Sequence, residues 1–209
     1  LLLLMMFLPA LLCNQAVDSE AATAPVSVFE CLKQNGVEYY LTLLGYPDGS
    51  LHTDAIDVLK NASLAGISKL SVYIIPCIPC DYKQQINNAV NILRRFNIVF
   101  DTVYIHVTLN SAWSTNKYDN RKIVEEMTSQ AIGLRVKTGI CTNAQLWKSI
   151  MGIDYTGVSK YPLWWNNQGP ANFTGFVGFG GWSTPTVRQF DQSVQLPCGL
   201  GYGNRDYYE

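Results

Sequence analysis

Strand-like and helix-like segments alternate along most of this chain, and that alternation restricts its fold more than any other feature. The clearest helical segment has Ile86, Ala89, Val90 and Leu93 at the i, i+3, i+4, i+7 spacing of an amphipathic helix. A repeated βα pattern implies parallel strands that are joined by right-handed crossovers. Strands are expected at residues 39–44, 70–75, 102–109 and 138–141, with helices between them.

The helical signal ends near Tyr155. Beyond it, glycine, proline, asparagine and aromatic residues punctuate short strand-like runs at 163–165, 186–190 and 205–208. The chain is 48% hydrophobic, so it can form one substantial core. The sequence therefore predicts an α/β fold in a single domain, a modified TIM-like barrel of five βα units followed by three strands with little helix.

The first twelve residues are apolar and carry no charge. This run is too short for a membrane span, which needs about 20 residues, and it is typical of the apolar region of a secretory signal. We expect residues 1–16 to be a signal peptide that is cleaved near Ala16, and residues 17–209 to form the barrel of a secreted, extracellular protein. A buried N-terminal helix is the alternative.

The charged residues nearly balance, with 15 Lys and Arg against 16 Asp and Glu and a net charge of −1. That balance gives no electrostatic reason to bind nucleic acid or an anionic membrane. The histidines, His52 and His106, do not have the spacing of a zinc knuckle. We expect a monomer without a metal, a cofactor, a nucleic-acid partner or a membrane partner.

One of the six cysteines lies in the expected signal peptide, and the other five predict two bridges and one free thiol in an oxidising compartment. Cys77 and Cys80 have CxxC spacing, for which we favour a local structural bridge over a redox motif or a zinc site. Cys31 and Cys198 would then pair and tie the first helix to the final strand. Cys141 would keep a free thiol.

The segment 102–109 alternates strictly between two kinds of side chain. Its apolar face consists of Val103, Ile105, Val107 and Leu109. The other face carries Tyr104, His106 and Thr108. In a barrel of helix-wrapped strands, polar side chains near the C-terminal end of a strand surround the substrate mouth. We therefore expect His106 and Thr108 in that mouth.

Five short blocks recur in a specific order and spacing. They are FECLKQNG (29–36), PCIPC (76–80), WKSIMG (147–152), YPLW (161–164) and FGGWS (179–183). Together they resemble the eukaryotic branch of the family-twenty-five glycoside hydrolases, which are muramidases, or lysozymes. The resemblance implies a barrel of five βα units plus three strands. It also implies peptidoglycan or another amino-sugar glycan as the partner, and a role in innate defence.

The resemblance also indicates where the catalytic residues of that family would lie. It places His106 and Thr108 on the Asp and the Glu of the family's Asp-x-Glu motif, so both carboxylates are replaced. It places Asp18 on the family's first-strand Asp and Asn204 on the Asp of its last strand. Asp206 shares the strand parity of Asn204 and would be a shifted substitute.

Glycoside cleavage requires a proton donor at the leaving oxygen and an anion beside the developing sugar cation. Thr108 is far too weak an acid, and a protonated His106 would repel that cation. Losing a positioned acid costs about 10²–10⁴-fold in rate. We therefore predict a glycan-binding pseudoenzyme whose mouth lacks two facing carboxyl groups. The alternatives are an active muramidase with carboxylates such as Asp18 and Asp206, and a decoy that binds other proteins.

Three roles remain open for His106. It would be an interior histidine that hydrogen-bonds Tyr104 or another polar group, part of a repurposed ligand site, or the base of a Cys–His pair with Cys141. The resemblance places Cys141 where the family has a tyrosine, which leaves a thiol near the mouth.

Aromatic side chains at predicted strand ends are candidates for stacking on sugar rings. The candidate substrate-binding residues are Tyr46, Tyr73, Trp113 and Trp165. For Trp164 and Trp182 a core position is at least as well supported.

Two N-glycosylation sequons begin at Asn61 and Asn172. Asn61 is expected to be exposed, because it lies off the apolar face of its helix.

Overall fold

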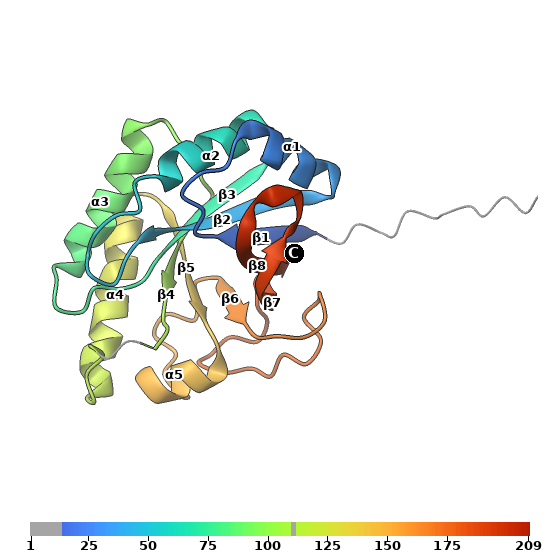
Figure 1. Ribbon diagram of the computed structural model, residues 1–209. Coiled ribbons are helices and arrows are strands. Elements are labelled where there is room, and N and C mark those ends of the chain that lie inside the picture. Colours follow the sequence, from blue (N-terminus) through green and yellow to red (C-terminus); the bar gives the residue numbers. More distant parts are fainter. Residues whose placement is uncertain (1–13, 110–111) are drawn as a thin grey trace, which may run out of the picture.

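The strands close into one barrel in chain order, from β1 to β8 (Figure 1). The computed structural model describes residues 14–109 and 112–209. The strands are β1 (Gln15–Ser19), β2 (Val37–Gly45), β3 (Lys69–Ile74), β4 (Thr102–His106), β5 (Lys137–Thr142), β6 (Leu163–Asn166), β7 (Val187–Leu196) and β8 (Gly201–Tyr208). Strands β1 to β7 are parallel, whereas β8 runs antiparallel to both β7 and β1. The predicted α/β barrel is confirmed.

Each of the first five strands is followed by a helix. The helices are α1 (Val26–Gln34), α2 (Ala55–Leu64), α3 (Tyr82–Arg95), α4 (Lys117–Gly133) and α5 (Ala144–Ile150). They lie outside the strands (Figure 1), while a short 3-10 turn, Pro197–Gly199, connects β7 to β8. The five predicted βα units and the three final strands with little helix are therefore confirmed.

Two apolar layers hold the barrel together. One lies between strands and helices, where Ile86, Ala89, Val90 and Leu93 of α3 are fully buried, as their spacing predicts. The other fills the barrel and consists of Ala16, Tyr39, Leu41, Leu43, Tyr73, Tyr104, Cys141, Trp164 and Val187. The interior is thus a packed core, and a ligand can enter only at an end of the barrel.

The alternation in β4 separates these two layers. Val103, Ile105 and Val107 are buried toward the helices, whereas Tyr104 belongs to the interior cluster. The prediction that Leu109 continues the apolar face is wrong, because β4 ends at His106 and Leu109 is 77% exposed.

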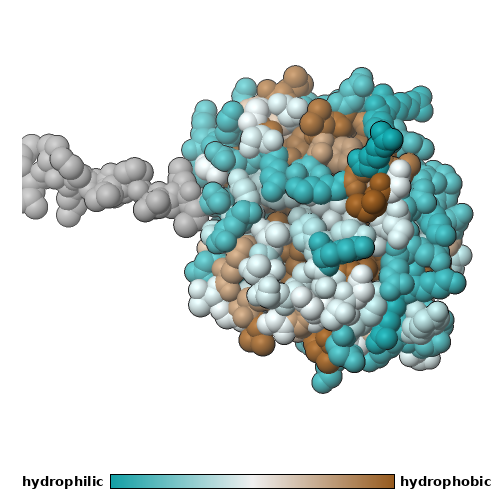
Figure 2. Space-filling view, turned by 180° about the vertical axis from the view of Figure 1, so that it is seen from behind, coloured by the Kyte–Doolittle hydropathy of each residue, from teal (hydrophilic) through white to brown (hydrophobic). Residues whose placement is uncertain are grey.

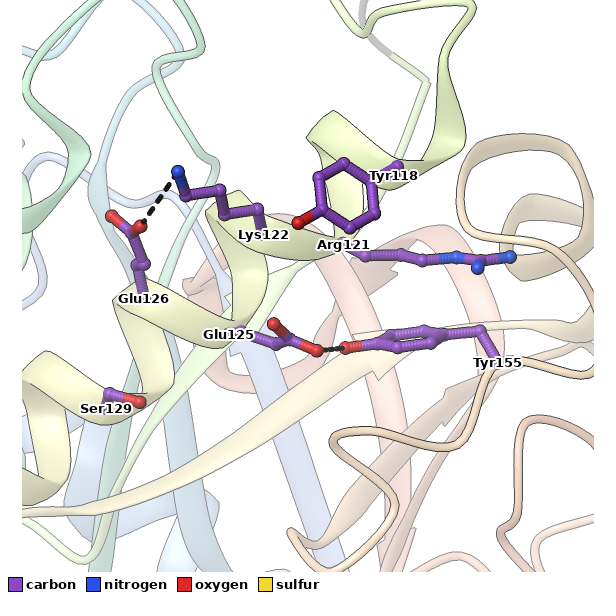
Figure 3. A pocket seen from close by; sticks show the side chains of 7 residues that line it. All are labelled: Tyr118, Arg121, Lys122, Glu125, Glu126, Ser129 and Tyr155. Carbon is purple, nitrogen blue, oxygen red and sulfur yellow. Dashed lines mark hydrogen bonds and ion pairs between the residues drawn. The ribbon is translucent and has the colours of Figure 1, made fainter.

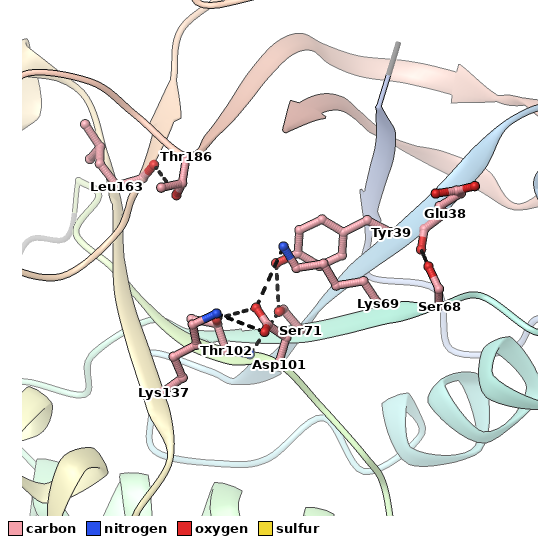
Figure 4. Close-up of polar contacts among 10 residues, drawn as sticks. All are labelled: Glu38, Tyr39, Ser68, Lys69, Ser71, Asp101, Thr102, Lys137, Leu163 and Thr186. Atoms are coloured by element: carbon pink, nitrogen blue, oxygen red, sulfur yellow. Dashed lines mark hydrogen bonds and ion pairs between the residues drawn. The ribbon is translucent and has the colours of Figure 1, made fainter. Parts of the chain in front are cut away.

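Polar contacts close the end of the barrel where the parallel strands begin (Figure 4). Asp101 lies 3.0 Å from the Nζ atom of Lys137 and 3.9 Å from that of Lys69. The Tyr39 hydroxyl donates a 2.7 Å hydrogen bond to Ser71. Because this end is filled, the candidate site must lie at the opposite end, where β1 to β6 finish.

The barrel begins earlier in the sequence than expected. β1 starts at Gln15, which pairs with Val37 and Tyr207, and Ala16 is buried. A boundary between residues 16 and 17 would fall inside this strand. Residues 1–13 of the expected signal peptide (1–16) lie outside the described residues, and its cleavage near Ala16 stays a prediction.

Both expected disulfides are present, and Cys141 is a buried free thiol. Cys31–Cys198 joins α1 to the turn before β8 across 167 residues of sequence, while Cys77–Cys80 lies in the loop before α3. In the described part of the chain, no group of three or more His, Cys, Asp or Glu side chains has the arrangement of a metal site.

The surface mixes polar and apolar residues. On the face drawn in Figure 2, apolar residues form separate brown patches between teal and white ones. Among residues 14–109 and 112–209, no helix has the length and hydropathy that crossing a bilayer requires.

The bridge that closes the long loop should contribute more stability than the short one. A disulfide restricts the unfolded chain more when it closes a longer loop, and such a bridge is typically worth about 2–5 kcal/mol. We expect Cys31→Ser/Cys198→Ser to lower the free energy of unfolding by about that amount, and Cys77→Ser/Cys80→Ser to lower it less. Urea denaturation of the three proteins measures both effects, and equal losses would contradict the loop-length argument.

Candidate functional site

A cavity of about 280 Å³ lies at the mouth of the barrel, beside the C-terminal ends of β1 and β3. Its walls come from the end of β1, from β3 and from the β7–β8 hairpin. The lining residues are Asp18, Ser19, Glu20, Tyr73, Ser193, Tyr202, Gly203 and Asn204. The expected first-strand Asp therefore faces the mouth of the barrel.

Asp18 is buried beneath this cavity and its carboxylate is held from several sides. Asn204 Nδ2 donates to Oδ1 and Gln189 Nε2 donates to Oδ2, both at 2.8 Å. The antiparallel register of β1 and β8 causes the first contact, since it sets Asp18 directly opposite Asn204. Burial raises the pKa of Asp18, and these amide donors oppose that rise.

Asp206 lies one step deeper, opposite Ala16, and is completely buried. Trp164 Nε1 donates a 2.8 Å hydrogen bond to its Oδ1 atom. Burial, followed by the charge of Asp18, raises the pKa of Asp206 well above its usual range, so the pair retains one shared proton. Oδ2 of Asp206 has no hydrogen-bond partner within the described residues.

The prediction was that the mouth lacks two facing carboxyl groups. Asp18 and Glu20 both line the cavity, so two carboxyl groups are present there, and it stays a prediction that they do not form a catalytic pair. A second carboxyl pair lies deeper in the barrel. The antiparallel last strand brings Asp18 and Asp206 into contact although 188 positions separate them (206 − 18). Asp206 does not line the cavity, so the pair does not lie on either side of a bound glycan as the two carboxyl groups of a glycosidase do.

His106 ends β4 and is partly buried, with both ring nitrogens shielded from solvent. Neither nitrogen has a hydrogen-bond partner within the described residues, so the expected bond to Tyr104 or another polar group is wrong. Burial lowers the pKa of His106 to about 4, which makes the ring neutral at physiological pH. Its edge-to-face neighbour is Tyr73, at a centroid distance of 5.6 Å.

A Cys–His nucleophile pair is not formed, although His106 and Cys141 are register neighbours on β4 and β5. No hydrogen bond joins them, since both ring nitrogens are unpartnered in the described chain. Burial, and then the charges of Asp18 and Asp206, raise the pKa of the Cys141 thiol well above its usual range. Cys141 is thus an unreactive core residue.

Glu20 belongs to the site and was missed in the sequence. It is exposed, lines the cavity and accepts a 3.2 Å hydrogen bond from the Tyr73 hydroxyl. The signal was present, because Asp18-Ser19-Glu20 is itself an Asp-x-Glu triplet, at the end of the first strand instead of the fourth.

The candidate sugar-stacking residues differ in their access to the mouth. Tyr73 lines the cavity, and Tyr46 is partly buried near it, packed against the interior cluster. Trp113 is partly buried, and its Nε1 atom donates a 2.9 Å bond to the backbone oxygen of Thr108. Trp165 borders a second cavity of about 330 Å³, but it is only 6% exposed. The guanidinium of Arg188 covers the Trp165 ring at 4.3 Å, which leaves little ring surface for a sugar.

Trp164 and Trp182 are core residues, at 1% and 5% exposure. The hydrogen bond to Asp206 gives Trp164 a further role in holding the carboxyl pair.

The sequons also differ from expectation. The prediction that Asn61 is exposed is wrong, because it is partly buried and its Nδ2 atom donates a 2.9 Å bond to the Ala24 carbonyl. Asn172 is exposed, and its Oδ1 atom accepts from the Thr174 backbone. Glycosylation at either position stays a prediction.

Larger hollows lie away from the mouth. One of about 490 Å³ runs along the outer side of α4 (Figure 3), where Tyr155 donates to Glu125 at 2.5 Å and Lys122 lies 3.9 Å from Glu126. Because its carboxylates are already paired, we place the candidate site at the mouth.

The shared proton predicts a pH effect on stability. Because the folded-state pKa of Asp206 is raised, the folded chain holds a proton that the unfolded chain releases above about pH 3.9, so stability falls as pH rises past that value. Asp206→Asn keeps a neutral side chain of the same shape. We expect the stability difference, variant minus wild type, to grow above pH 4 by up to about 1.4 kcal/mol per pH unit.

Urea denaturation between pH 4 and pH 8 measures this difference. Subtracting the two curves cancels the contribution of His106, whose lowered pKa acts in the opposite direction. Asp57→Asn, at an exposed position on α2, is the control. A difference that does not change with pH would contradict the shared proton.

Comparisons with known proteins agree on one family. The family model described as "Lysozyme-like protein 1" matches residues 11–190. Probable GH family 25 lysozyme 4 of Dictyostelium discoideum is 33% identical over 182 residues, which cover 85% of this chain and 83% of that protein.

Solved structures show the same fold. A family GH25 lysozyme from Aspergillus fumigatus superposes with a TM-score of 0.72 at 16% identity, over 94% of this chain and 93% of that one. The autolysin LytC from Streptococcus pneumoniae, solved with a synthetic peptidoglycan ligand, gives a TM-score of 0.73 at 12% identity, over 94% of this chain and 47% of that one. This chain belongs to the lysozyme-like proteins of glycoside hydrolase family 25.

Proposed function

We propose that this protein is a secreted lysozyme-like protein that binds peptidoglycan or a related amino-sugar polymer in innate defence without cleaving it. The observation that best supports this proposal lies at the end of β4. A neutral His106, with Thr108 beyond it, occupies the positions at which the resemblance places the family's catalytic Asp and Glu. Neither side chain supplies a carboxylic acid for the leaving oxygen or an anion for the sugar cation.

The Asp18–Asp206 pair does not replace those groups. Asp206 is buried below the cavity and is held by Trp164, while both oxygens of Asp18 already accept amide hydrogen bonds. A glycosidase needs a carboxyl group on each side of the glycosidic bond, and Asp206 does not reach the cavity in which that bond would lie. We therefore assign the Asp18–Asp206 pair a structural role.

Binding is supported by the mouth itself. The cavity combines the aromatic side chains Tyr73 and Tyr202 with the polar groups of Ser193, Asn204 and Glu20. Aromatic surface with a few polar groups is typical of sites that recognise sugars. The solved relative that carries a peptidoglycan ligand has the same fold.

An active muramidase is the second candidate, and one observation favours it. Asp18 and Glu20 lie two residues apart at the end of one strand and both border the cavity. Two carboxyl groups with that spacing are what the family motif provides on its fourth strand. In this candidate, Glu20 would donate the proton and Asp18 would stabilise the cation.

A lysis assay beside a sedimentation assay separates the candidates. We expect purified wild-type protein to leave bacterial walls intact between pH 4 and pH 8, while it sediments with insoluble peptidoglycan. Lysis by wild type that Asp18→Asn or Glu20→Gln abolishes would establish the muramidase instead. Absence of both lysis and sedimentation would rule out glycan binding and favour a protein-binding decoy.

Introducing carboxylates at positions 106 and 108 tests whether their replacement explains the expected lack of activity. His106→Asp with Thr108→Glu should place two carboxyl groups at the mouth and raise lysis above the wild-type level, because a positioned acid contributes about 10²–10⁴-fold. His106→Asn with Thr108→Gln is the matched neutral control. A folded carboxylate variant that binds glycan but remains as inactive as its control would show that other losses, such as Asn204, are decisive.

A further inference from the structure

The cavity at the mouth is negatively charged. It is lined by the carboxyl groups of Asp18 and Glu20, and no Lys or Arg side chain borders it. Arg205 neighbours Asn204 in β8, but consecutive side chains in a strand point to opposite sides, and its guanidinium lies 3.9 Å from Asp191. The described residues around the cavity thus leave its negative charge uncompensated.

The same negative charge raises the pKa values of two tyrosines, Tyr73 and Tyr46. Burial, then the charges of Asp18 and Glu20, raise the pKa of Tyr73 well above its usual range. Burial, then the charges of Glu20, Asp54 and Asp48, raise the pKa of Tyr46. The charges that raise these two pKa values come from Asp and Glu side chains, with a further contribution from the Cys141 thiol at Tyr73.

The two carboxyl groups that line the cavity have different tasks. Asp18 is buried and each of its oxygens already accepts a hydrogen bond from Asn204 or Gln189, so it mainly contributes charge. Glu20 is exposed and accepts a rather long hydrogen bond from the Tyr73 hydroxyl, at 3.2 Å. Glu20 is therefore the group that can bind a donor from a ligand directly.

The rest of the wall suits a sugar ring. Tyr202 is 73% exposed at the rim, and Asn204 and Ser193 supply neutral polar groups. Beside Tyr73 lies His106, whose buried ring nitrogens have no partner in the described chain and which is neutral, so it does not offset the acidic charge. At about 280 Å³ the cavity is near the lower end of ligand sites, which fits one small polar ring.

We propose that this cavity selects hexosamine units whose 2-amino group is free and protonated, with Glu20 as the acceptor for the ammonium group and Tyr202 as the stacking surface. This inference rests on the proposed glycan-binding function and names the sugar that the site prefers. An acetylated amine carries no charge, so it gains nothing from the acidic wall. A sugar that bears a carboxylate is repelled by Asp18 and Glu20.

Calorimetric titration of the whole protein with two matched oligosaccharides tests the preference. The probes are the β-1,4-linked tetramers of glucosamine and of N-acetylglucosamine, at pH 6 and low ionic strength. We expect the free-amine tetramer to bind about tenfold more tightly, since a hydrogen bond between charged groups is stronger than one between neutral groups. Added salt should reduce that preference.

Glu20→Gln should abolish most of the preference, because it removes the negative charge and keeps a polar side chain of the same size. Glu30→Gln, the same chemical change at an exposed position on α1, should leave both affinities at the wild-type value. Sedimentation with peptidoglycan before and after de-N-acetylation distinguishes a bacterial-wall source of the free amine from a chitosan-like one. Either source agrees with the proposal.

Two results would overturn the inference, and they are distinguishable. Equal binding of the two tetramers, or tighter binding of the acetylated one, would refute the selection for a free amine and leave the proposed glycan binding intact. Failure to bind either tetramer or either form of peptidoglycan would remove the proposed function together with the inference. A preference that persists in Glu20→Gln would refute the role assigned to Glu20.

Discussion

The antiparallel pairing of β8 with β1 fixes the position of the acidic groups at the mouth of this barrel. Because β8 closes the barrel between β7 and β1, its side chains enter the interior beside those of the first strand. In this register Asn204 lies opposite Asp18, and Asp206 lies opposite Ala16, deeper in the barrel. Burial of these groups would be costly without partners, and the shared proton, the amide donors and the Trp164 indole supply them.

The fold and the chemistry at the mouth are separate questions for this chain. The helices, the strand order and the packed interior are those of a lysozyme-like fold. The groups at the strand ends include a neutral imidazole at His106, and a buried carboxyl pair lies below them. The fold supports membership of the family, whereas the function of this protein has to be inferred from the residues of the site.

Much of the fold could be predicted from the sequence, because βα periodicity is a local signal. The buried face of α3 and the two faces of β4 follow directly from spacing. The contact between Asp18 and Asp206 could not be predicted, since it depends on the register between the first and last strands. Trp165 shows the same limit, because the side chain that covers it, Arg188, comes from the neighbouring strand β7. Glu20 was different, since its triplet with Asp18 was visible in the sequence and only its location on the first strand was unexpected.

The bridge between Cys31 and Cys198 has a consequence for how the protein is made. The ribosome synthesises Cys31 early, yet its partner emerges 167 residues later, immediately before the strand that completes the ring. Until β8 has been synthesised, β1 lacks one of its two neighbours and Asp18 lacks the amide donor Asn204. Assembly of the mouth therefore has to wait for the last strand, and the bridge then ties α1 to the turn before that strand.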